Sequence, residues 1–276
     1  MKRLIALIGA ALATGCAAPP EVPDAPDAPV TGPTIVSLNP CTDAILAEVA
    51  DPAQLLAISH YSHDPRGTSM DLATARRFPA TGGTVEEVLA LDPDVVVAGS
   101  FLPPATHTAL ERMGVRVETF GIANSVAASE AQVLRLARIA GHPDRGTALN
   151  TRIDAALDRA RWDGESASAI LWQPGEIVPG EDTLVSELLA LAGFSSHSAA
   201  RGLDQAAYLP LEGLLADPPQ VLLTADVSRA QAHPALAALP MLRADYDASL
   251  LYCGGPTIVR AAARLAEVRA AVEAAK

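Results

Sequence analysis

Short apolar runs alternate with helical patterns through the first half of the chain. Four of these runs have strand length and are rich in apolar or β-branched residues: residues 34–38, 55–59, 95–98 and 116–120. A helical pattern follows the first run, and another at residues 105–113 ends beside Gly114, a residue type typical of helix ends. Strands that alternate with helices predict a mainly parallel sheet covered by helices.

The alternation restarts in the second half, after a long helical stretch at residues 126–162 that is broken at 141–143. Strands are expected at residues 169–172, 221–224 and 250–252, a helix at 184–192, and a last helix from Pro256 onward. The second half therefore repeats the kind of pattern found in the first.

One pair of segments makes this repetition specific. Residues 86–97 read EEVLALDPDVVV and residues 212–223 read EGLLADPPQVLL, and each predicts a short helix, a turn at proline and a buried strand. The predicted fold class is α/β, with two similar lobes of mainly parallel sheet joined by a helical segment. The expected divisions are an N-terminal lobe at 34–125, a connecting helical segment at 126–165 and a C-terminal lobe at 166–276.

The N-terminus indicates export. Lys2 and Arg3 precede an apolar run at residues 4–12, which is too short to cross a bilayer as a helix. The following Leu-Ala-Thr-Gly-Cys ends at Cys16 and is similar to the cleavage signal of bacterial lipoproteins. This similarity predicts a signal peptide at 1–15, lipidation of Cys16, and a periplasmic protein anchored to a membrane of the cell envelope. An ordinary secretory signal is the alternative.

Composition narrows the possibilities further. Six prolines between residues 17 and 33 favour an extended chain, so residues 16–33 are expected to be a tether. Half of the 276 residues are apolar, which is enough for a packed core. The net charge of −12 argues against a nucleic-acid partner. The sequence contains no GxSxG, P-loop or GxGxxG motif, so no enzymatic activity and no cofactor are predicted.

Several segments, taken in order, resemble the periplasmic substrate-binding proteins of ABC importers, in particular the family that binds cobalamin, ferric siderophores or haem. The matching segments are residues 35–59, 86–100, 146–160, 181–194 and 209–223. The resemblance implies two lobes joined by a long, rigid helix, with a ligand cleft between them and little closure. It also implies a monomer that captures a metal–organic chelate and delivers it to a permease dimer with its ATPase. A ferric siderophore or cobalamin is expected as the chelate in preference to haem.

Glu86 and Glu212 occupy equivalent places in the two repeated segments. The resemblance implies that each projects from the tip of a lobe and pairs with arginines of the permease. Two separated carboxylates suit a partner with two related subunits. The alternative is local: Thr84 and Glu87 fit a capping box, which places Glu86 in the first turn of a helix, where the helix dipole favours a carboxylate.

Polar and aromatic residues follow the predicted strands, where the cleft of such a fold is expected. The candidate ligand-binding residues are Asn39, Thr42, His60, Tyr61, His63, Ser100, Phe101 and Trp172. The resemblance places the Tyr61 segment where cobalamin-binding members have an aromatic contact, and we expect Tyr61 and Trp172 to face each other across the lobes. A core aromatic is the alternative for Trp172.

His60, His63 and Asp64 are metal-ligand types at close spacing, but no fourth donor stands near them in the sequence. We therefore predict no metal site. Contact with an organic ligand, axial binding of haem iron by one His or Tyr, and a structural role remain open. An exported metal-dependent enzyme that uses these three residues is the alternative function, and a cell-envelope scaffold is a third.

Two thiols remain once Cys16 is lipidated. Cys41 and Cys253 both lie beside predicted strand ends, and two lone cysteines in an oxidising compartment usually pair. We expect a disulfide that joins the edge of the cleft to the far end of the chain. Two free thiols or a pair of thiolate ligands are the alternatives.

Overall fold

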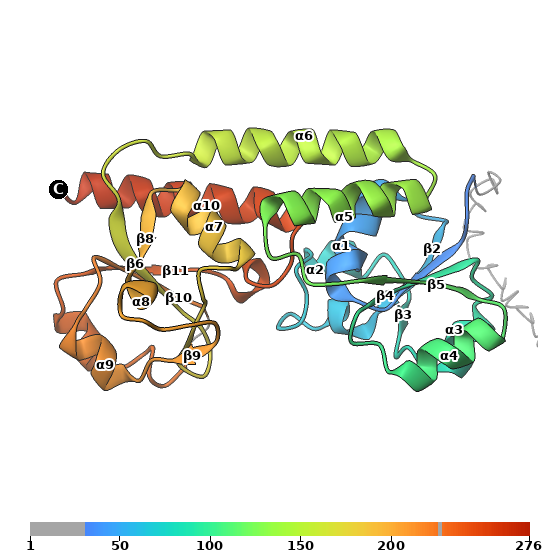
Figure 1. Cartoon of the computed structure of the whole chain (residues 1–276), viewed down its shortest axis with the longest axis horizontal. Helices are drawn as coiled ribbons and strands as arrows, with labels where there is room; N and C mark the ends of the chain where they lie inside the picture. Colours follow the sequence, from blue (N-terminus) through green and yellow to red (C-terminus); the bar gives the residue numbers. More distant parts are fainter. Residues whose placement is uncertain (1–30, 226–227) are drawn as a thin grey trace, which may run out of the picture.

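The computed structural model describes residues 31–225 and 228–276, so the predicted signal peptide, Cys16 and most of the tether lie outside the described residues. Two α/β lobes lie side by side, and long helices run along one side of both (Figure 1). Within the described ranges, no helix has the length and apolar character that crossing a membrane requires.

The N-terminal lobe is built on a parallel sheet with the strand order β3-β2-β1-β4-β5. Its strands are β1 (Ile35–Ser37), β2 (Leu55–Ser59), β3 (Ala80–Thr81), β4 (Val95–Gly99) and β5 (Arg116–Phe120). Its helices are α1 (Pro40–Val49), α2 (Leu72–Ala75), α3 (Val85–Ala90), α4 (Pro104–Arg112) and α5 (Val126–Ile139). The central strands β1 and β4 are buried because helices cover both faces of the sheet.

The C-terminal lobe has a second parallel sheet with the order β11-β10-β6-β8. Its strands are β6 (Ala167–Trp172), β8 (Phe194–Ser196), β10 (Val221–Thr224) and β11 (Leu242–Asp245). A small antiparallel pair, β7 (Ile177–Val178) and β9 (Ala207–Tyr208), lies beside it. The helices of this lobe are α7 (Leu184–Leu191), α8 (His197–Ala200) and α9 (Leu211–Ala216).

The repeated segments occupy equivalent places in the two sheets. In the N-terminal lobe α3 leads into β4, which pairs with the first strand, β1. In the C-terminal lobe α9 leads into β10, which pairs with the first strand of that sheet, β6. The predicted α/β fold of two similar lobes with parallel sheets is confirmed.

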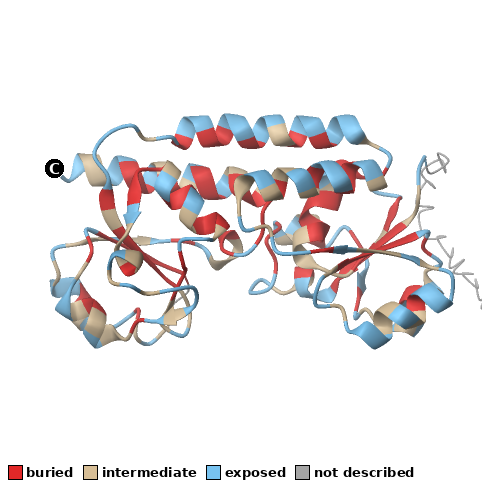
Figure 2. Cartoon of the chain, in the orientation of Figure 1, coloured by how far each residue is buried: buried red, intermediate tan, exposed pale blue. Residues whose placement is uncertain are grey.

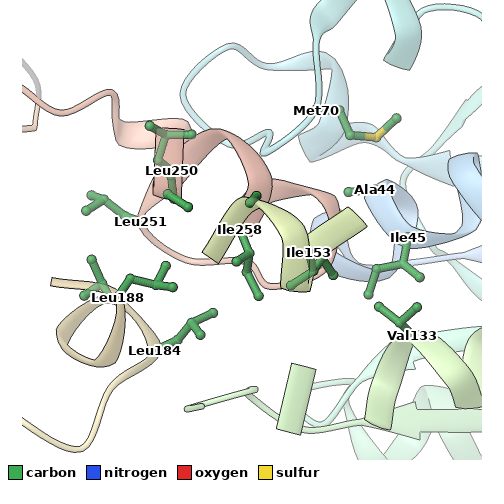
Figure 3. Close-up of a cluster of buried hydrophobic side chains, with 14 of the residues drawn as sticks. Ala44, Ile45, Met70, Val133, Ile153, Leu184, Leu188, Leu250, Leu251 and Ile258 are labelled. Carbon is green, nitrogen blue, oxygen red and sulfur yellow. The ribbon is translucent and has the colours of Figure 1, made fainter. Parts of the chain in front are cut away.

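The strand predicted at residues 250–252 is wrong. Residues Ala248–Leu250 form a 3-10 turn, and the strand of this region is the earlier β11. Leu250 and Leu251 are buried because they enter the apolar core (Figure 3). As an edge strand, β11 is only half-buried and lacks a long apolar run, so its sequence does not stand out.

Helices α6 (Pro143–Ala160) and α10 (Pro256–Ala274) join the lobes. α6 packs along α5 over the N-terminal lobe and along α10, which begins beside α1 and runs over the C-terminal lobe (Figure 1). The buried side of α6 faces the other helices and its outer side is exposed (Figure 2). One core cluster contains side chains of both lobes, among them Val133, Ile153, Leu188 and Ile258 (Figure 3). The lobes are therefore parts of one packed body.

Candidate functional site

Three adjoining pockets form a groove at the C-terminal ends of the parallel strands, and we call this groove the cleft. The first, of ≈ 450 Å³, includes Tyr61 and lies in the N-terminal lobe. The second is a narrow pocket of ≈ 60 Å³ that shares Asn39, Gly99 and Phe101 with the first. The third, of ≈ 630 Å³, lies between the lobes and shares Tyr252 with the second. Neighbouring pockets share lining residues, so the three pockets adjoin one another.

The N-terminus of α1 shapes the centre of the cleft. The Asn39 side chain caps the helix, with its Oδ1 accepting a hydrogen bond from the Cys41 N–H at 2.9 Å. The Thr42 hydroxyl donates to the Asn39 carbonyl at 3.0 Å and is buried. Gly99 is needed opposite the cap, because a Cβ there would stand 2.7 Å from Asn39 Nδ2. Asn39, Thr42, Ser100 and Phe101 thus all lie in the cleft wall, and their contact with a ligand stays a prediction.

Large apolar side chains are exposed along the cleft. Tyr61 is 56% exposed, Phe101 80%, Ile122 71% and Tyr252 63%. Exposure of large apolar side chains to water is unfavourable, so apolar residues gathered in a groove indicate a binding surface. The sequence reasoning missed Ile122 and Tyr252. The usable signal for Tyr252 was its position beside Cys-Gly-Gly-Pro, because adjacent glycines and a proline favour a loop over a strand.

The wall of the cleft is rich in carboxamides and poor in charge. Five side-chain amides line the second and third pockets: Asn39, Asn124, Gln132, Gln173 and Gln205. Among the described residues that line the three pockets, Asp182 alone is charged. The cleft can therefore exchange hydrogen bonds with polar groups on a ligand, but none of the described residues that line it is a cation that could neutralise an anionic group.

The two candidate histidines lie beside backbone carbonyl groups, and neither lines the three pockets of the cleft. His63 Nε2 lies 3.1 Å from the Ala75 carbonyl oxygen and 3.2 Å from that of Phe78. His60 Nδ1 lies 3.3 Å from the Thr81 carbonyl oxygen, and its ring stacks at 4.0 Å on Tyr61. Asp64 accepts from the Arg66 N–H. Over the described ranges, no three His, Cys, Asp or Glu side chains are placed to hold a metal ion.

The prediction that Trp172 contacts the ligand is wrong. Its side chain is 0% exposed and packs with Ile170 and Leu214 inside the C-terminal lobe. The indole Nε1 donates to the Leu209 carbonyl at 3.0 Å, which satisfies its one donor. Because side chains alternate between the faces of a strand, the end of β6 directs Trp172 into the core, and the next residue, Gln173, lines the cleft.

The docking candidates lie on α3 and α9, on the side of each lobe away from α6 (Figure 1). Glu86 and Glu212 are both exposed in the first turn of their helices. The capping box of α3 is made by Thr84 and Glu87: Thr84 Oγ1 accepts from the Glu87 N–H, and the Glu87 carboxylate accepts from Thr81 at 2.9 Å. Because Glu87 is the acidic residue of the capping box, the Glu86 side chain is not needed to cap α3.

Cys41 and Cys253 are joined by a disulfide in the structure, with their Cα atoms 5.0 Å apart. Cys41 lies at the N-terminal end of α1 and lines the cleft. Cys253 is buried in the segment that returns from the C-terminal lobe to α10. The bond therefore fastens that returning segment to the wall of the cleft.

A buried carboxyl supports the loop that carries Tyr61. Asp43 Oδ2 accepts from the Ser62 hydroxyl at 2.6 Å and from the Ser59 N–H at 3.0 Å. These bonds tie α1 to the 3-10 helix His60–His63. Complete burial raises the pKa of Asp43 to about 8, although its hydrogen bonds oppose the shift. The carboxyl therefore holds its proton at neutral pH.

Comparison with known proteins identifies the class. The chain belongs to the periplasmic binding protein family, whose model matches residues 35–244. It is 24% identical over 225 residues to the cobalamin-binding protein of Halobacterium salinarum, an alignment that covers 76% of this chain and 59% of the relative. The chain thus spans about three fifths of the length of the curated relatives it matches. The family predicted from the sequence is confirmed.

Solved structures show the same fold. The periplasmic heme-binding protein RhuT from Roseiflexus sp. RS-1 in apo form superposes with a TM-score of 0.69 at 23% identity, over 89% of this chain and 100% of that one. The periplasmic vitamin B12 binding protein BtuF of Vibrio cholerae gives 0.66 at 18% identity, over 87% and 97%. The family and these neighbours are binding proteins, not enzymes.

Asp43 predicts how stability depends on pH. Between the ordinary pKa of 3.8 and the folded value of about 8, the folded protein holds a proton that the unfolded chain releases. The free energy of unfolding should therefore fall as pH rises through this window, by at least about 2 kcal/mol between pH ~5 and ~8. Asp43→Asn keeps an acceptor for Ser59 and Ser62 but cannot titrate, so its stability should change less.

Urea denaturation of both proteins at the two pH values measures this difference. Because the other titrating groups are common to both proteins, subtracting the variant isolates Asp43. An equal pH dependence in the two proteins would show that Asp43 is ionised in the folded state.

Proposed function

We propose that this protein captures a large metal–organic chelate with an amide-rich, uncharged periphery, represented by cobalamin, and delivers it to an ABC permease. The observation that carries the proposal is the cleft wall, which holds five carboxamides and four exposed apolar side chains and, among its described residues, one charged side chain, Asp182. Carboxamides of the protein can pair donor to acceptor with carboxamides of a corrin ring. Tyr61, Phe101 and Tyr252 supply flat contact area.

The same wall disfavours anionic chelates. Haem carries two propionates and ferric catecholates carry several negative charges, and proteins usually meet such groups with Arg or Lys. Burying an unpaired carboxylate costs several kcal/mol. Similarity to a cobalamin-binding relative supports the choice. The heme-binding neighbours share the fold at 23% identity or less, and so do not decide between the ligands.

Calorimetric titration with cyanocobalamin, a neutral ferric hydroxamate and haemin tests this choice. We expect cyanocobalamin to bind at micromolar concentration or below, and haemin to bind at least about tenfold more weakly. Tyr61→Ala and Phe101→Ala should each weaken cyanocobalamin binding by about 1 kcal/mol or more. Trp172→Phe serves as a control that lies outside the cleft. Haemin binding more tightly than cyanocobalamin would overturn the assignment of the ligand.

Delivery to the permease is proposed through Glu86 and Glu212. Both are exposed and stand in the first turns of equivalent helices on the two lobes, so together they present two carboxylates to a partner with two related subunits. Glu86→Gln and Glu212→Gln should leave ligand affinity unchanged. Each should weaken binding to the transporter by roughly 1–3 kcal/mol, because a charge-assisted pair is lost.

Glu87→Gln is the matched control for docking, since Glu87 adjoins Glu86 but caps α3. It should lower stability by up to about 1 kcal/mol and leave docking intact. The measurements are binding to the permease and uptake in reconstituted vesicles. Full uptake by the Glu86→Gln/Glu212→Gln protein at saturating ligand would remove the docking role.

Anchoring by lipid is proposed from the N-terminal sequence, in which small residues precede Cys16 after a short apolar run. A lipidated cysteine followed by a proline-rich tether would hold the folded body near the membrane that carries the permease. Labelling of cells with a radioactive fatty acid should mark the natural protein and leave Cys16→Ser unmarked. Equal labelling of both proteins would contradict the anchor.

A further inference from the structure

The chain returns from the C-terminal lobe to the N-terminal lobe through residues 251–255, which we call the crossing segment. It is held at both ends. Leu251 is buried in the shared core, and Gly255 N–H donates to the buried hydroxyl of Ser129 on α5 at 2.7 Å. Between these points Cys253 bonds to Cys41 on α1. A segment from one lobe is thus fastened to two helices of the other.

Two glycines allow the crossing segment to pack closely against α1 and α5. A Cβ on Gly254 would stand 2.2 Å from Ser129 Oγ, and one on Gly255 would stand 2.5 Å from Ile45 Cγ1. Gly255 also has φ of +60°, which disfavours other residues. The backbone of the crossing segment therefore lies directly on α1 and α5, with no space for a side chain between them.

Tyr252 is the side chain that the crossing segment presents to the cleft. It lines both the narrow central pocket and the pocket between the lobes. At 63% exposed, its ring has little packing of its own, so its position depends on the backbone that carries it. The Tyr252 carbonyl oxygen lies 3.7 Å from Cys41 Sγ, which puts the disulfide in direct contact with this backbone.

We propose that the Cys41–Cys253 disulfide is a positioning element of the binding site, which holds Tyr252 at the boundary of the two lobes for contact with the ligand. The inference rests on the proposed function for the ligand, but the placement of Tyr252 is a property of the free protein. The bond also closes a loop across 212 residues and must add stability by limiting the unfolded chain. A purely stabilising bond would leave Tyr252 and the affinity of the folded protein unchanged.

The free protein is tested first, by fluorine NMR with 3-fluorotyrosine in place of its four tyrosines. The Tyr252 signal is assigned by its loss in Tyr252→Phe. In Cys41→Ser/Cys253→Ser this signal should shift and narrow, because the ring becomes more mobile. The signals of Tyr208 and of the buried Tyr246 should stay in place, which reports that the protein is folded. An unchanged Tyr252 signal would overturn the proposal, whatever the ligand.

Binding of cyanocobalamin then tests whether the bond acts through Tyr252. The four proteins compared are the natural one, Cys41→Ser/Cys253→Ser, Tyr252→Ala and the triple variant, which together form a double-mutant cycle. Loss of the bond should weaken affinity about fivefold or more in the natural background and by less than about twofold in Tyr252→Ala. Equal losses in both backgrounds would mean that the bond acts on the cleft by another route.

A second variant keeps the test valid if the serine pair does not fold. Ser129→Ala removes the other anchor of the crossing segment and retains the disulfide. It should move the Tyr252 signal in the same direction by a smaller amount. If the natural protein binds no cyanocobalamin, the ligand assignment fails on its own, while the NMR comparison still decides the placement of Tyr252.

Discussion

An apolar core runs from one lobe to the other beneath α6 and α10, and it sets what the two lobes can do. Ile153 of α6 and Ile258 of α10 are fully buried in it, with Val133 from one lobe and Leu188 from the other. Each such side chain contributes roughly 1.5–3 kcal/mol when it leaves water. Wide opening of the lobes would expose these groups, so we expect the cleft to be largely formed before ligand arrives.

In a preformed cleft, recognition of the ligand depends on the side chains that line the wall. The loops after β1, β4, β5 and β6 bring carboxamides and exposed aromatic rings to one groove, and the parallel order of both sheets brings these loops to the same side. The groups that hold these side chains in position lie behind the wall of the cleft. Asp43 holds the Tyr61 loop and the disulfide holds Tyr252, so two cleft aromatics on different segments both depend on α1.

The strands that are buried on both faces were the elements best predicted from the sequence. The α3–β4 and α9–β10 segments were predicted because a strand buried on both faces needs an uninterrupted apolar run. The two segments also have similar amino-acid sequences, so the repeat could be recognised directly. β11 was missed because an edge strand needs no such run. Residues 250 and 251 look like a strand because the shared core, not a sheet, buries them.

Side-chain direction was harder to predict than strand position. Both faces of β6 are covered, so its pattern does not say whether Trp172 meets the core or the cleft. Tyr252 reaches the cleft only because Cys253, Gly254 and Gly255 seat the chain on α1 and α5, an arrangement made by residues distant in sequence. The capping role of Glu87 could be predicted, since a capping box is local.

The salt dependence of cyanocobalamin binding tests the central claim most directly, because binding to a surface of low charge depends little on ionic screening. Titrations at low and at high salt should give saturable binding of one ligand per chain, with a dissociation constant that changes by less than about twofold. A complete lack of saturable binding, or an affinity that falls about tenfold or more at high salt, would contradict an amide-lined cleft of low charge as the basis of recognition.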